Sequence, residues 1–70
     1  MTPTLRQIET VLEHLATAPI QQRRQNYNIA LHTDLDVGLV DEILAELSGD
    51  GRIIRTSHGG KGHAWETIKT

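Results

Sequence analysis

Cysteine and phenylalanine are both absent from the 70 residues of this chain, which has one tryptophan and one tyrosine. The lack of cysteine excludes disulfides and thiolate metal sites. The core must therefore be built from aliphatic side chains, and a chain of this length supports one small core. We expect residues 1–70 to form a single domain.

Long apolar runs are also missing. No stretch approaches the ~20 residues that a membrane-spanning helix needs, so we expect no membrane contact. The first residues, MTPTLRQIET, carry charged and amide side chains that do not fit a signal peptide. With no cysteine and no export signal, we expect a cytoplasmic protein.

The net charge of −2 is weak evidence against a nucleic-acid-binding protein, but the charges are segregated along the chain. Residues 20–33 carry Arg23 and Arg24 and no acid, and residues 34–50 carry six acids and no base. Residues 51–65 are basic again, with three cations: Arg52, Arg55 and Lys61. The chain is thus basic, then acidic, then basic.

Three helices are predicted before residue 50. Thr2 is a candidate N-cap for the first, with Pro3 in its first turn, and Ala18-Pro19 ends it. A short second helix is expected from about residue 22 to His32. Its apolar face would be formed by Tyr27, Ala30 and Leu31.

The third helix has the strongest signals. Asp36 is a good N-cap, and an apolar stripe follows at helical spacing. The residues of that stripe are Val40, Ile43, Leu44 and Leu47. Ser48-Gly49-Asp50-Gly51 should stop the helix, with one glycine in the left-handed conformation.

Two β-rich runs, residues 52–57 and 63–68, flank a glycine-rich segment and predict a β-hairpin. That segment fails as a phosphate loop, because Arg55 stands where the first glycine is needed and Gly62 follows Lys61. His58 and His63 lack an evident third ligand, so no metal or other cofactor is expected. Without a cysteine nucleophile, or a serine with an evident base, we expect no enzymatic activity.

The stretch IALHTDLDVGLVDEILAELSGDGRIIRT resembles the winged helix-turn-helix superfamily. Ile29-Ala30 match its second helix, Leu35 its turn, and Gly51 with the following isoleucines the start of its wing. The resemblance covers nearly the whole chain. It implies a mainly α fold with a small antiparallel β-hairpin, that is, three helices plus a two-stranded wing.

In that superfamily the third helix usually enters the major groove of DNA and the wing lies along the backbone. The resemblance thus implies a small double-stranded DNA-binding protein, of the kind that regulates transcription and often forms homodimers. The implied DNA-binding residues are Arg23, Arg24, Arg52, Arg55, His58, Gly60, Lys61, Gly38 and Leu39.

The base-facing part of the third helix carries Asp41, Glu42 and Glu46 and no cation, although Arg, Lys, Asn and Gln make most bidentate base contacts. An alternative therefore stays open: a protein-interaction module that docks a basic partner on this acidic helix, with Leu39 as an exposed apolar anchor. Trp65 and Tyr27, the two aromatic side chains, are expected to be core or boundary anchors.

Overall fold

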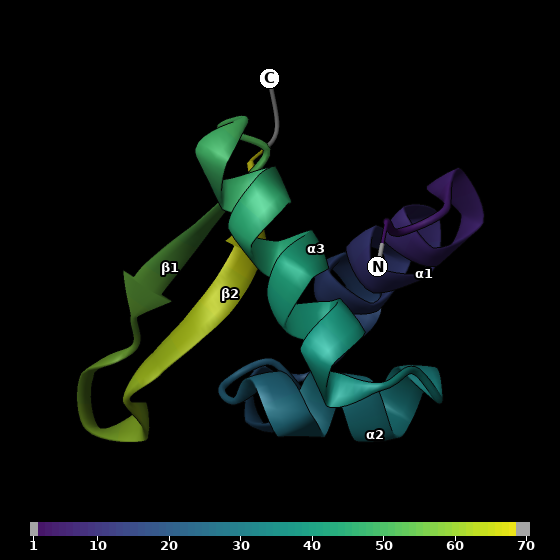
Figure 1. The fold of residues 1–70 in the computed structure, drawn as a ribbon. Coiled ribbons are helices and arrows are strands. Elements are labelled where there is room, and N and C mark those ends of the chain that lie inside the picture. Colours follow the sequence, from purple (N-terminus) through teal and green to yellow (C-terminus); the bar gives the residue numbers. More distant parts are fainter. Residues whose placement is uncertain (1, 69–70) are drawn as a thin grey trace.

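The computed structural model describes residues 2–68, except for the side chain of Lys61. Figure 1 shows three helices with a hairpin of two strands to one side of them. The elements in chain order are α1 (Leu5–Thr17), η1 (Ile20–Gln22, a 3₁₀ helix), α2 (Asn26–Thr33), α3 (Val37–Gly49), β1 (Ile53–Ser57), η2 (Gly59–Lys61, a 3₁₀ helix) and β2 (His63–Thr67). This arrangement confirms the expected fold class.

The N-cap of α1 is Thr4, so the prediction of Thr2 was wrong. The Thr4 hydroxyl accepts a hydrogen bond from the Gln7 backbone N–H at 3.2 Å, and the Gln7 side chain accepts one from the Thr4 N–H at 2.8 Å. This reciprocal capping box satisfies two backbone donors. Thr2 is followed three residues later by Leu5, which cannot return such a bond. The predicted end at Ala18 is confirmed.

Helix α2 begins at Asn26, later than expected, and ends at Thr33. It buries Ile29 completely, whereas Tyr27 is 62% exposed and Leu31 73% exposed. The expected apolar face was therefore wrong for these two residues. Residues four apart share one side of a helix, so Tyr27 and Leu31 lie together on the side facing away from the core.

Helix α3 follows the sequence-based prediction closely. The Asp36 carboxylate accepts hydrogen bonds from the backbone N–H groups of Gly38 and Leu39 at 2.9 and 3.3 Å, which confirms the cap. At the other end, Arg52 N–H bonds to the Leu47 carbonyl, and Gly51 has a φ of 75°. These are the features of a Schellman motif, in which glycine takes the left-handed position without steric cost.

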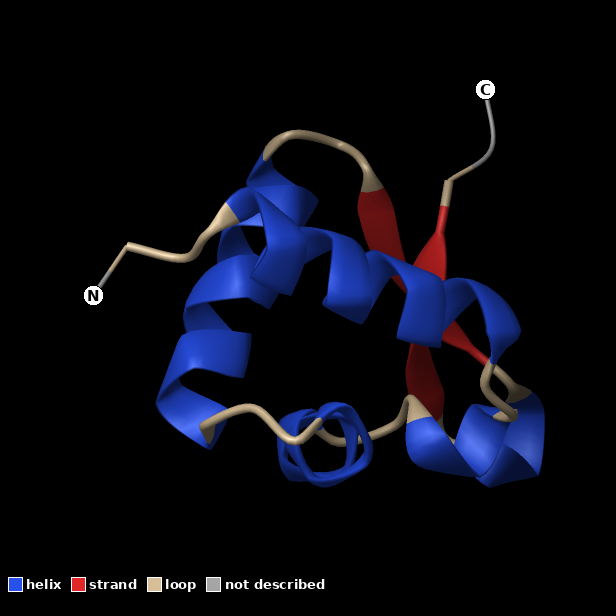
Figure 2. Cartoon of the chain, turned by 90° about the vertical axis from the view of Figure 1, so that its right-hand side faces the viewer, coloured by secondary structure: helices blue, strands red, loops and turns tan. Residues whose placement is uncertain are grey.

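Strands β1 and β2 pair antiparallel, with Ile53 opposite Thr67 and Arg55 opposite Trp65. This pairing confirms the predicted hairpin. Seen from the side in Figure 2, the strands lie behind the helices. Ile53 joins the helical core, and Trp65 is partly buried against it, as expected.

The core is aliphatic and draws on every α-helix and on β1. Its buried members are Val11, Leu15, Ile29, Ala30, Leu39, Val40, Ile43, Leu44, Leu47 and Ile53. The predicted stripe of α3 lies entirely within this set. Among the described residues, the structure has no helix with the length and apolar character needed to cross a membrane.

Candidate functional site

The hairpin is attached to the start of α2 by Arg23. The Arg23 guanidinium donates a hydrogen bond from Nη1 to the Trp65 carbonyl at 3.0 Å and lies 3.7 Å from a carboxylate oxygen of Glu66. The Trp65 backbone N–H returns a 3.0 Å bond to the Arg23 carbonyl. Only 13% of the Arg23 side chain is exposed. Its charge is therefore used within the fold rather than presented to solvent.

Arg24 and Arg55 lie together where the turn before α2 meets the hairpin. Arg55 donates from Nη2 to the Arg24 carbonyl at 2.9 Å, and its guanidinium carbon lies 5.3 Å from the centroid of a Trp65 ring. The Arg24 guanidinium packs against Gly62, where an added Cβ would lie 3.2 Å from Nη2. We call Arg24, Arg55 and Gly62 the hairpin cluster.

A chain of side-chain hydrogen bonds joins the hairpin cluster to α3. Trp65 donates from its indole Nε1 to Asn26 Oδ1 at 3.1 Å, and Asn26 donates from Nδ2 to Asp41 Oδ1 at 2.6 Å. This chain fixes the hairpin against both α2 and α3. It also places one α3 carboxylate on the side of the helix that faces the hairpin.

The hairpin tip contains three of the remaining residues implied in DNA contact, His58, Gly60 and Lys61. Gly60 is exposed, and a Cβ there would meet nothing within 4 Å. His58 Nε2 lies 3.0 Å from Glu66 Oε1 and 3.2 Å from the Thr56 hydroxyl, so this ring is used inside the hairpin. The Lys61 side chain is outside the described part of the structure.

Arg52, the last of the implied cations, is exposed and precedes β1. It lies beyond the C-terminal end of α3, at the opposite end of β1 from the tip. The structure therefore brings Arg24 and Arg55 together, holds Arg23 inside, and leaves Arg52 apart.

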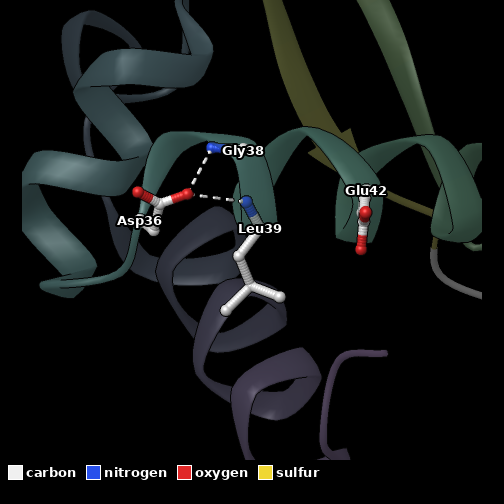
Figure 3. Close-up of a pocket in the computed structure, with 4 residues that line it drawn as sticks. All are labelled: Asp36, Gly38, Leu39 and Glu42. Carbon is white, nitrogen blue, oxygen red and sulfur yellow. Dashed lines mark hydrogen bonds between the residues drawn. The ribbon is translucent and has the colours of Figure 1, made fainter. Parts of the chain in front are cut away.

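The start of α3 differs from the expectation in one respect. Leu39 is only 7% exposed, so its predicted role as an exposed anchor was wrong. Figure 3 shows its side chain turned toward α1, beside a small hollow of about 200 Å³ lined also by Asp36, Gly38 and Glu42. Because the hollow is shallow and Leu39 already packs in the core, it offers little room for a ligand.

The solvent-facing surface of α3 is acidic. The exposed residues are Val37, Gly38, Asp41, Glu42, Ala45, Glu46, Ser48 and Gly49. Gly38 is held near the Asp36 carboxylate, where an added Cβ would lie 3.0 Å from Oδ2. No Lys or Arg occurs in the sequence of this helix, so α3 carries no cation for base readout.

The sequence prediction missed an exposed apolar surface where α2 meets the start of α3. Tyr27, Leu31, Leu35 and Val37 line an open hollow of about 520 Å³ there, together with Ala30, Asp34 and Asp36. We call Tyr27, Leu31, Leu35 and Val37 the apolar corner. The available signal was the Ile29-Ala30 pair: once these residues face the core, Tyr27 and Leu31 must face outward.

The histidines are dispersed among several contacts. His14 and His32 stack with ring centroids 5.9 Å apart, and His14 Nε2 lies 2.9 Å from the Gln22 carbonyl oxygen. Within residues 2–68, no group of three or more His, Asp or Glu side chains is arranged to hold a metal ion.

Comparison of the chain with models of known protein families, with curated proteins and with solved structures found no match in any of the three.

Proposed function

We propose that this chain is a small winged-helix DNA-binding protein that contacts the phosphate backbone of double-stranded DNA through its hairpin and the turn before α2. A role as a transcriptional regulator is part of this proposal, because the resemblance to winged-helix proteins implies it.

The observation that carries the proposal is the hairpin cluster. Arg55 donates a hydrogen bond to the carbonyl of Arg24, 31 positions away, and the Arg24 guanidinium packs against Gly62. Arginine is well suited to phosphate. Gly62 has no side chain, which leaves room for the Arg24 guanidinium beside the hairpin. The contact of Arg55 with the Trp65 ring orders its side chain before any ligand arrives.

The acidic α3 limits what kind of DNA binding is consistent with the structure. Asp41 is held by Asn26 rather than directed into a groove, and α3 supplies no arginine, lysine or amide for paired contacts with bases. Phosphate contacts position a protein but do not read sequence. We therefore expect weak sequence preference and strong dependence on salt.

Four cations are available for phosphates once Arg23 is set aside: Arg24, Arg52, Arg55 and Lys61. Counterion release then predicts that a plot of log affinity against log salt concentration has a slope of about −3 to −4. The test is fluorescence anisotropy with a labelled duplex of mixed sequence, at several salt concentrations.

The single variants Arg24→Ala and Arg55→Ala should each lower the magnitude of the slope by about one. The matched control is Arg6→Ala, which removes the same charge from an exposed position near the start of α1, away from the hairpin (Figure 1). If Arg6→Ala weakens binding as much as the hairpin variants, or if the wild-type chain does not bind at low salt, the proposal is wrong.

A further inference from the structure

Three of the large apolar side chains that are exposed among the described residues lie at the apolar corner. Leu31 is 73% exposed, Tyr27 62% and Val37 46%. Single exposed apolar residues need no explanation, but a contiguous group that lines a hollow is typical of an interaction surface. The hollow of about 520 Å³ shows that these side chains surround one concave surface.

The charges around the apolar corner have one sign. Asp34 and Asp36 line the hollow, and none of its described lining residues is Lys or Arg. Apolar contact area with a charged rim is the usual anatomy of a protein–protein interface.

A second copy of this chain does not fit the corner. A two-fold symmetric contact would bring the same surface of each copy together, so the acidic rim of one copy would lie close to the acidic rim of the other. Like charges brought together in an interface cost several kcal/mol. The acidic rim of Asp34 and Asp36 instead favours a partner with positive charge.

We propose that the apolar corner docks a basic amphipathic segment of another protein, with apolar side chains in the hollow and Lys or Arg facing Asp34 and Asp36. This surface differs from the outer face of α3 that the sequence indicated as the docking element, because it adds α2 and the turn before α3. The binding mode is that of a helix in an apolar groove. The proposal does not depend on DNA binding.

The probe is a synthetic helical peptide of leucine and lysine, about 15 residues long so that it can form a helix, with leucine at helical spacing. Its counterpart has glutamate at every lysine position. We expect amide NMR shifts of the full chain to concentrate at Tyr27, Leu31 and Val37 with the lysine peptide. The glutamate peptide should leave them unchanged.

The matched variants are Leu31→Ala and Leu5→Ala, because Leu5 is 70% exposed but lies on α1. Neither side chain is in the core, so both variants should fold, which their circular dichroism spectra would check. Leu31→Ala should lower the affinity for the lysine peptide by about tenfold, as expected when one leucine loses its buried contact. Leu5→Ala should leave the affinity unchanged.

Several results would overturn the proposal. These are equal binding of the two peptides, equal loss in the two variants, shifts confined to the hairpin, or no shift at all. Sedimentation that shows a dimer dissociated by Leu31→Ala would assign the corner to a second copy instead.

Discussion

The hairpin cluster lies where the turn before α2 meets the hairpin, whereas the apolar corner extends from Tyr27 to the start of α3, and the two differ in charge. On the hairpin side, Arg23 is held by Trp65 and Glu66, while Arg24 and Arg55 lie nearer to solvent. At the corner, the Asp36 carboxylate caps α3 and Asp34 occupies a left-handed position. Each region thus uses part of its charge to build the fold and leaves the remainder for binding.

Neighbouring residues of one charge type can therefore have separate roles. Arg23 and Arg24 are adjacent, yet only Arg23 is nearly enclosed. In each region, some charged side chains hold the fold together and others are left for binding. Substituting one of each kind and comparing the effects tests this difference.

The largest effect is expected from Arg23→Ala. It removes a charged hydrogen bond to the Trp65 carbonyl and the ion pair with Glu66, and should lower the free energy of unfolding by about 1 to 3 kcal/mol. Arg24→Ala is the adjacent control and should change it by less than about 0.5 kcal/mol, as is usual for surface positions. Urea unfolding measures both. Equal losses would show that the two arginines do not differ in the way described.

The next effect in size is expected at the corner. Asp36→Ala removes the cap of α3 and should cost about 1 kcal/mol in thermal or urea unfolding. Asp36→Asn should keep most of the free energy of unfolding that Asp36→Ala loses, because an amide oxygen can also cap the N-terminus of α3. Asp50→Ala, at the other end of the same helix, should be neutral or slightly stabilising, since an acid there is unfavourable to the helix dipole. A loss at Asp50 as large as at Asp36 would contradict the capping account.

The smallest effect is expected from Asp34→Gly. Asp34 has a φ of 59°, the one described non-glycine residue with a positive φ. Glycine adopts this conformation without strain, although it gains freedom in the unfolded chain. We expect a gain of about 0.5 kcal/mol in unfolding free energy, with Asp34→Ala as the destabilising counterpart. If glycine and alanine behave alike, the left-handed turn is not under strain.

Local signals made much of the fold predictable. Helix α3 has a cap at Asp36, an apolar stripe and a glycine stop within one continuous segment, and all of these are confirmed. The hairpin was equally clear from its β-rich runs and glycines. Pro3 favours Thr2 as the N-cap of α1 in the sequence. In the structure, the reciprocal hydrogen bonds of Thr4 and Gln7 set the start of α1 instead. Tyr27 could not be oriented from α2 alone, because a helix this short has too few turns to define its buried side.

The candidate site was less predictable, because its contacts join distant parts of the chain. Nothing local distinguishes Arg23 from Arg24. The distinction comes from Trp65, which is 42 residues away from Arg23 in the sequence. Likewise, the burial of Leu39 depends on its packing against α1, and the bond from Asn26 to Asp41 depends on how α2 and α3 meet.

The most direct test of the proposed function is an amide NMR titration of the full chain with a mixed-sequence DNA duplex, first at low and then at physiological salt. We predict shifts at Arg24, Arg55 and Gly62 that diminish as salt rises, with little change at Leu31 and Val37. Shifts centred on residues 37–46 that persist at physiological salt would show that the acidic helix, rather than the hairpin, binds DNA. That result would contradict the account of the hairpin cluster given above.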